Sequence, residues 1–208
     1  MAELTVLLVR HAESLGNLSG QFQGQTDTPL SSKGRRQAER LAARLADQPI
    51  QAVYTSDMSR AHETARPIAE RTGAPLIAKQ ELREIDVGKW SGLTFEEITS
   101  RFPEEAAAWH AGDPHFRRGG GESYVDAQQR MVAGMEEIVA AHSDGQIVVV
   151  SHGAVLRALL AHVLGFPING LYRLQIANAS WTLIAWDGEH WFVRHINDTC
   201  HLDHETGS

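Results

Sequence analysis

The sequence predicts an α/β fold, a three-layer sandwich in which helices flank a mostly parallel central sheet and a small cap covers the C-terminal edge of its strands. Short runs rich in Val, Leu and Ile alternate with longer segments whose apolar residues recur at helical spacing. This alternation is typical of parallel strands joined by right-handed helical crossovers. The runs at 4–9 and 146–150 are apolar throughout, as expected for strands buried on both faces.

The first half of the chain contains three predicted strands and two predicted helices. A polar loop at 18–32 follows the first strand, and loops of this length in compact domains are usually functional. Asp57 or Ser59 can cap the second helix, which a Gly-Ala-Pro sequence ends after residue 72. We expect strands at 4–9, 50–56 and 76–78, and helices at 34–46 and 59–72.

The second half begins with a segment rich in Gly and aromatic residues, which we interpret as a cap insertion at about 87–122. We expect a single domain at 1–200, with this cap packed over the binding edge of the sheet, and a flexible tail at 201–208. The expected elements are short helices at 94–101 and 103–110, helices at 123–141 and 154–164, a strand at 146–151, and a hairpin of strands at 180–186 and 190–196.

Composition excludes several classes of function. A formal net charge of -7 over 208 residues argues against nonspecific binding to nucleic acid or to an anionic membrane. The single cysteine, Cys200, excludes an internal disulfide framework. Eleven His are present without a zinc-type spacing, so we expect no metal and no other cofactor. No long apolar or basic segment precedes the first strand, and we therefore expect a cytoplasmic protein.

Reactive side chains follow several of the predicted strands. Arg10 and His11 end the first strand, Arg60 follows the second, Glu84 follows the third, and His152 ends the strand at 146–151. Carboxyl ends of parallel strands share one edge of a sheet, so these residues can converge there. Arg binds phosphate oxygens bidentately, and a neutral imidazole can attack phosphorus. Each residue taken alone could instead be a surface ion-pair member or a buried, hydrogen-bonded His.

The ordered set of these motifs resembles the histidine phosphatase superfamily, which has a phosphoglycerate-mutase-like fold. A single match would be weak, but the motifs occur in the order typical of the family and extend from residue 4 to about 160. They are Val9-Arg10-His11-Ala12-Glu13, Ser56-Asp57, Arg60-Ala61, Leu82-Arg83-Glu84, Gly121-Glu122-Ser123 and Val149-Val150-Ser151-His152-Gly153.

The resemblance implies a metal-independent reaction through a phosphohistidine intermediate. His11 would be the nucleophile, and Glu84 would be the general acid to the leaving group and then the base for water. Phosphoryl oxygens would be held by Arg10, Arg60 and His152. Ser151 would support the site, because no orienting base for a serine nucleophile is evident. The substrate-binding residues would include Asn17, Gln23, Gly24 and Gly153.

One position departs from the pattern of many family members. Ala12 stands where they carry Gly, and Ala requires an ordinary backbone conformation. We expect this difference to reshape the floor of the pocket slightly without inactivating the enzyme.

Three functions remain open at this point. Hydrolysis of a small-molecule phosphomonoester is favoured, because the segment between Glu84 and Glu122 leaves only a modest lid and a mutase must exclude water. The first alternative is a phosphoglycerate mutase, and the Arg117-Arg118 pair could then contact a substrate carboxylate or could be a solvated turn. The second alternative is a protein that binds phosphate without catalysing a reaction. The apolar hairpin at 181–196 could also support a homodimer.

Overall fold

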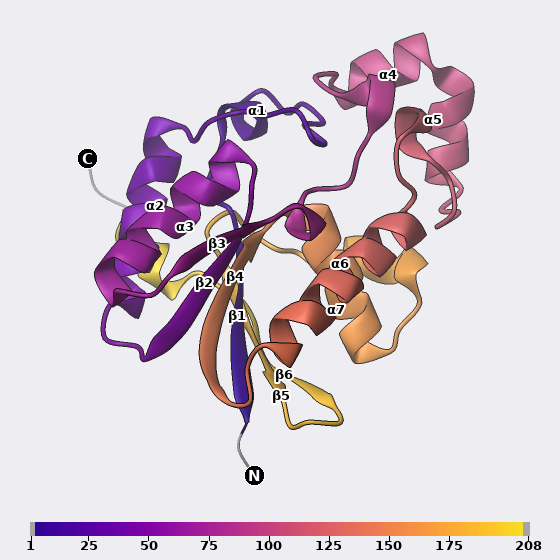
Figure 1. The fold of residues 1–208 in the computed structure, drawn as a ribbon. Coiled ribbons are helices and arrows are strands. Elements are labelled where there is room, and N and C mark those ends of the chain that lie inside the picture. The colour runs from indigo at the N-terminus through magenta and orange to yellow at the C-terminus, as the bar shows by residue number, and fades with distance from the viewer. Residues whose placement is uncertain (1–2, 206–208) are drawn as a thin grey trace.

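The computed structural model describes residues 3–205, and a six-stranded sheet forms the centre of the molecule (Figure 1). Four strands run parallel in the order β3-β2-β4-β1. Beyond β1, β5 pairs with β1 in antiparallel orientation, and β6 pairs in the same way with β5. The predicted, mostly parallel α/β sheet is confirmed. The strands are β1 (Leu4–Arg10), β2 (Ile50–Ser56), β3 (Leu76–Lys79), β4 (Gly145–Ser151), β5 (Trp181–Trp186) and β6 (Trp191–Asp198).

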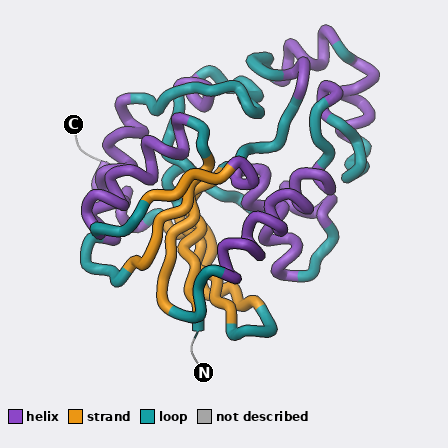
Figure 2. Tube along the Cα trace, viewed as in Figure 1, coloured by secondary structure: helices purple, strands orange, loops and turns teal. Residues whose placement is uncertain are grey.

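Helices cover both faces of this sheet and complete three layers (Figure 2). On one face lie α2 (Ser32–Leu45) and α3 (Ser59–Thr72), and on the other lie α6 (Tyr124–Ala140) and α7 (Gly153–Leu164). Each helix presents a stripe of apolar residues to the sheet, as the periodicity of the sequence predicts. The layered core therefore follows from the local pattern of the chain.

The central strand β1 shows why its sequence is apolar without alternation. Leu7 and Val9 pack in the cluster that contains α2 and α3, whereas Val6 and Leu8 pack in the cluster that contains α6 and α7. All four side chains are buried. Full burial of one such side chain contributes about 1.5–3 kcal/mol, so the strand is held firmly from both faces.

The lid, defined as residues 87–122, lies beyond the C-terminal ends of the strands, on the side of α6 and α7 (Figure 1). It is built around Trp90, which is fully buried and has Phe22, Trp109 and Phe116 as ring neighbours. The Trp90 indole N–H donates a hydrogen bond to a Glu105 carboxylate oxygen at 3.1 Å. The lid elements are the 3-10 turns η2 (Gly88–Trp90) and η3 (Arg118–Gly120) and the helices α4 (Phe95–Arg101) and α5 (Pro103–His110).

The predicted cap of α3 was wrong. Met58 is the N-cap residue and makes no side-chain capping bond, while the carboxylate of Asp27 accepts a hydrogen bond from the Ser59 backbone N–H at 2.8 Å. Asp57 is instead paired with Arg83, whose Nε donates to it at 2.7 Å. Asp27, from a distant loop, thus accepts from a backbone N–H at the start of the helix. The local candidate Asp57 is unavailable because it forms a stronger, charge-assisted hydrogen bond with Arg83.

Short elements also occur where none were predicted. A capping box between Ser14 and Asn17 forms the one-turn helix α1 (Leu15–Leu18). The tail expected to be flexible from residue 201 forms the 3-10 helix η5 (Cys200–Glu205), and Leu202 packs on a small apolar cluster. Residues 206–208 lie outside the described part of the chain. The two remaining 3-10 segments are η1 (Gln80–Leu82) and η4 (Ile168–Arg173).

Among residues 3–205, no helix combines the length and the apolar character that a membrane crossing requires.

We predict that Gly34→Ala destabilises the protein, although Ala is the better helix former by about 1 kcal/mol. A Cβ at this position in α2 would overlap the backbone carbonyl of Glu13, in the segment that follows His11. Overpacking against backbone costs about 1–3 kcal/mol or more, so the clash outweighs the gain in propensity. Urea unfolding measures the difference. The control is Gly170→Ala, where a Cβ meets only Phe166 at 3.9 Å, and equal stability of the two variants would contradict the prediction.

Candidate active site

His11 lies immediately after β1, with 3% of its surface exposed. Its backbone N–H donates to the Ser151 carbonyl at 2.9 Å, which fixes it beside the end of β4. The ring Nδ1 is 2.7 Å from the Ala12 carbonyl oxygen. Because a carbonyl can only accept, Nδ1 carries the proton and Nε2 keeps a free lone pair.

Burial lowers the pKa of His11 well below 6.5, and the neighbouring charges of Arg60 and Arg10 lower it further. The imidazole is therefore neutral at neutral pH. A neutral ring with its lone pair on Nε2 is the form of histidine that acts as a nucleophile.

Two guanidinium groups lie near this imidazole, that of Arg60 buried and that of Arg10 partly buried. Arg10 donates from Nη1 to the Ile176 carbonyl at 2.6 Å, and the fully buried Arg60 donates to the carbonyls of Thr26 and Gly24, both at 2.8 Å. Burial lowers the pKa of both groups, while the charge of Glu84 raises it. The Nε of each has no hydrogen-bond partner among the described residues. These donors remain available to an anion.

His152, the N-cap residue of α7, faces His11 with a distance of 5.1 Å between the ring centroids. It is fully buried, and neither ring nitrogen has a hydrogen-bond partner in the described part of the chain. Burial lowers its pKa well below 6.5, and the charges around it act in the same direction. A buried polar ring without a partner is costly, so it marks a place where a ligand completes the hydrogen bonding.

Glu84 reaches the same cavity from the loop after η1. One carboxylate oxygen accepts from the backbone N–H groups of Ile85 at 2.9 Å and Val155 at 3.2 Å, and the other accepts from Ala154 at 3.2 Å. Two of these donors belong to the first turn of α7, whose positive end attracts a carboxylate. The carboxyl group is thus held in one orientation toward the cavity.

The loop that carries Glu84 is itself anchored from two sides. Ser151 donates from its hydroxyl to the Leu82 carbonyl at 2.8 Å, which agrees with the supporting role predicted for it. Arg130, on α6, donates to the carbonyls of Glu81 and Arg83 at 2.8 and 2.9 Å and forms an ion pair with Glu122 at 2.8 Å. Arg130 could not be identified from the sequence, because no motif reveals its contacts with the backbone carbonyls of a distant loop.

Arg10, His11, Arg60 and Glu84 line one cavity of about 340 Å³, whereas His152, fully buried and packed against His11, is not on its lining. The structure brings together the distant positions that the sequence singled out, from β1, α3, the Glu84 loop and α7. Phe22, Trp109 and Tyr124 also line it, whereas Trp90 is core and does not. The predicted residues on its lining are Arg10, His11, Asn17, Gln23, Gly24, Arg60, Glu84, Arg118 and Gly153.

The two adjacent arginines of the lid have different surroundings. Arg118 is buried, lies 3.7 Å over the ring of Tyr124 and lines the cavity. Arg117 is exposed, outside the lining, and pairs with Asp126 at 3.0 Å. The structure therefore argues against the contact with substrate predicted for Arg117, because its side chain is directed to the start of α6.

Arg157 was missed by the sequence analysis. It lines the cavity from α7, one turn after Gly153, and its Nε is buried without a partner in the described residues. It is also the only arginine or lysine in the otherwise apolar helix at 153–164. A permanent charge on such a helix is the signal that could have identified it.

Ala12 does not reshape the cavity in the expected way. Its side chain is fully buried in a small cluster with Leu30, Ala38 and Ala179, and it is absent from the lining of the cavity. Its backbone N–H donates to the Thr64 hydroxyl at 3.0 Å. The methyl group therefore contributes to packing behind the site.

Comparison with known proteins identifies the family. The model of the histidine phosphatase superfamily (branch 1) matches residues 6–199. The chain belongs to this superfamily. This histidine phosphatase is 35% identical over 198 residues to phosphoserine phosphatase 1 of Hydrogenobacter thermophilus, an alignment that covers 95% of this chain and 93% of that protein.

Two further relatives show the range of named activities around this histidine phosphatase. The probable phosphoglycerate mutase GpmB of Yersinia enterocolitica is 34% identical, with 96% of this chain and 95% of that protein covered. The solved structure of a mycobacterial glucosyl-3-phosphoglycerate phosphatase is 32% identical, with a TM-score of 0.86 and coverage of 95% of this chain and all of that one. The relatives of this chain thus carry the names of phosphatases and of a probable mutase.

We predict that acidification below about pH 6.5 destabilises the protein through His11 and His152. Their pKa values are lowered in the folded chain, so below 6.5 the unfolded chain binds protons that the folded chain does not. The free energy of unfolding is unaffected by these groups above pH 6.5. Below it, the free energy falls by up to about 1.4 kcal/mol per group for each pH unit, until the lowered pKa is reached.

Urea unfolding between pH 5 and 8 checks this prediction. The double variant His11→Asn/His152→Asn should show a flatter dependence on pH, and the exposed control His190→Asn should keep the wild-type dependence. The same slope in the wild type and the double variant would contradict the assignment.

Proposed function

We propose that this histidine phosphatase hydrolyses small phosphate monoesters by way of a phosphohistidine at His11. The observation that carries the proposal is a buried, neutral imidazole with a free Nε2, set between Arg10 and Arg60, whose remaining donors have no partner among the described residues. A phosphate dianion supplies the negative charge and the hydrogen-bond acceptors that pair with these guanidinium groups.

In the first half-reaction, Nε2 of His11 attacks phosphorus while the bond from phosphorus to the ester oxygen breaks. Glu84 in its protonated form gives its proton to the departing alkoxide, which leaves as an alcohol. Arg10, Arg60 and His152 donate hydrogen bonds to the three remaining phosphoryl oxygens, whose charge builds up in the transition state.

In the second half-reaction, the Glu84 carboxylate takes a proton from a water molecule, whose oxygen attacks phosphorus. The bond from phosphorus to Nε2 breaks, inorganic phosphate leaves, and His11 returns to its neutral form. Each side chain thus regains its starting state, and the residues of this chain provide every group that the two steps need.

We propose further that the substrate carries a carboxylate beside its phosphate. Arg118 and Arg157 line the same cavity, and each has a nitrogen without a hydrogen-bond partner in the described structure. Two relatives are named for phosphoserine and glucosyl-3-phosphoglycerate, and both compounds contain a carboxylate. Replacement of Arg118 by Met should raise KM for phosphoserine more than for ethyl phosphate, and an equal rise for both esters would contradict this assignment.

The mutase alternative is supported by the similarity to GpmB. A mutase returns the phosphoryl group to a bound glycerate and must keep water out, whereas the lid here is short. Incubation with 3-phosphoglycerate, with and without 2,3-bisphosphoglycerate, separates the two functions. We expect inorganic phosphate as the product, and accumulation of 2-phosphoglycerate would favour the mutase.

The location and assembly of the protein also remain proposals. A cytoplasmic location is supported by the presence of only one cysteine, and detection of the native protein in another compartment would contradict it. A homodimer through the hairpin is supported by β6, an edge strand on which Phe192 and Ile196 are exposed. Light scattering of the purified chain distinguishes dimer from monomer.

We predict that His11→Asn lowers kcat by at least about 10³-fold, because no other group can form the covalent intermediate. Wild-type protein quenched during turnover of a ³²P-labelled ester should retain label in alkali and lose it in acid, as a phosphohistidine does. The exposed control His62→Asn should keep both the rate and the label. Persistence of labelling in His11→Asn would overturn the proposal.

We predict that Glu84→Gln lowers kcat/KM for alkyl phosphates by about 10²–10⁴-fold, since an alkoxide needs a proton in order to leave. The loss for p-nitrophenyl phosphate should be much smaller, because nitrophenolate leaves unprotonated. Comparison of the two esters isolates the proton transfer from general damage to the site. Glu137→Gln, at an exposed position on α6, is the control. Equal losses on both esters would contradict the assignment of Glu84 as general acid.

A further inference from the structure

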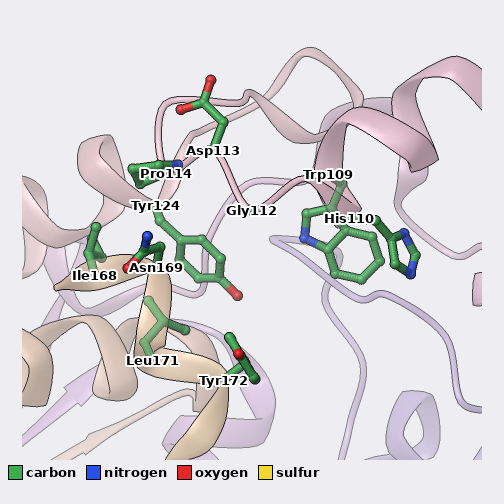
Figure 3. Close-up of a pocket in the computed structure, with 10 residues that line it drawn as sticks. All are labelled: Trp109, His110, Gly112, Asp113, Pro114, Tyr124, Ile168, Asn169, Leu171 and Tyr172. Carbon is green, nitrogen blue, oxygen red and sulfur yellow. The ribbon is translucent and has the colours of Figure 1, made fainter.

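A second cavity of about 310 Å³, whose lining is drawn in Figure 3, shares two of its lining residues with the active-site cavity. It lies between the lid segment 109–114 and the 3-10 helix η4. Trp109 and Tyr124 line both cavities, so a molecule held by its phosphate near His11 would pass these two rings to enter the second space. Its lining consists of Trp109, His110, Gly112, Asp113, Pro114, Tyr124, Ile168, Asn169, Leu171 and Tyr172.

The lining of this cavity selects for an uncharged group. No Lys or Arg lines it, and Asp113 supplies its only acidic side chain. A second anion would therefore find repulsion here, in contrast to the active-site cavity with its four arginines. Figure 3 shows the Asp113 carboxylate directed away from the rings of Trp109 and Tyr124. His110 and Asn169 add polar groups to the lining, and most of the remaining lining is apolar.

The rings of the cavity are held in place before any ligand binds. Trp109 has Phe22, Trp90 and Phe95 as ring neighbours at 5.5 to 5.9 Å between centroids. The guanidinium of Arg118 lies over the Tyr124 ring at 3.7 Å. Because these side chains are already fixed, little conformational entropy is lost when a ligand binds.

Tyr172 completes the cavity from η4 and is 67% exposed, an unusual state for a large ring. In Figure 3 the hydroxyl end of Tyr124 is directed toward the space between Trp109 and Tyr172. Aromatic rings stack and meet edge to face with one another, and a ring that enters this space would cover the exposed face of Tyr172. The cavity is thus matched to a flat, apolar group.

We propose that this cavity, called the aryl subsite, binds an aromatic ring on the leaving group of substrates whose phosphate lies at His11. The inference rests on the proposed function and extends it by one feature of the substrate. In this arrangement the phosphate lies with Arg10 and Arg60 in one cavity, Arg118 lies over the Tyr124 ring that lines both, and the aryl subsite receives the uncharged end of the molecule.

The test compares kcat/KM for ω-phenylalkyl phosphates, with linkers of two to six methylene groups, against alkyl phosphates of the same linker length. Both members of a pair have a leaving group of the same kind, so the ratio of their kcat/KM values reports only the effect of the phenyl ring. We expect the ratio to reach about tenfold at one linker length in the wild type, since burial of a phenyl group is worth at least that factor. Tyr172→Ala should lower it about threefold or more, and Tyr172→Phe should retain it.

Phe192→Ala is the matched control, because this half-exposed ring on β6 lines neither cavity, and it should leave the ratio unchanged. Ratios near one at every linker length, or equal ratios in the wild type and Tyr172→Ala, would overturn the aryl subsite while leaving the phosphatase function standing. A phosphoethyl glucoside serves as a further substrate that carries a sugar. If Tyr172→Ala lowers kcat/KM for this glucoside alone, the cavity binds a sugar and the aryl assignment is contradicted. A wild type that cleaves none of the esters would contradict the proposed function and this inference together.

Discussion

The parallel pairing of β1 with β4 determines the geometry of the whole site. Its register sets Arg10 opposite Ser151, so that His11 and His152 leave the two strands at the same level and their rings come within 5.1 Å. A bond from the His11 backbone to the Ser151 carbonyl extends this pairing one residue beyond the strand. A slip of one residue would turn every side chain of β1 to the opposite face, so the apolar packing of both faces also protects the register.

Burial of cations is the main cost of this arrangement, and the backbone offsets much of it. Carbonyls of Ile176, Thr26 and Gly24 accept from Arg10 and Arg60, and the buried Nε of each guanidinium has no partner among the described residues. The same desolvation, with the same charges, keeps His11 and His152 neutral. A local excess of positive charge in a chain of net charge -7 therefore suits this cavity to an anion and keeps the His11 imidazole unprotonated.

Much of the fold and the centre of the site could be predicted, because both depend on features that are local in the chain. Apolar runs and helical periods define the layers, and residues at the ends of parallel strands must share an edge. Supporting contacts could not be predicted in this way. Asp57 belongs to Arg83 and not to its own helix, and Arg130 holds the Glu84 loop through backbone carbonyls. Such partners are far apart in sequence and follow no period.

The sequence by itself determined the kind of chemistry: strands apolar on both faces, ending in arginine and histidine, commit the chain to a buried anion site at one sheet edge. Only the tertiary structure decided which neighbours act in it. Arg118 lines the cavity while Arg117 pairs with Asp126 outside it, at a turn with two positive-φ glycines that no periodicity describes. Likewise, Tyr172 and Trp109 line one cavity only because the lid and η4 face each other across it. Side-chain direction in irregular segments depends on such distant packing, which the local pattern of residues does not contain.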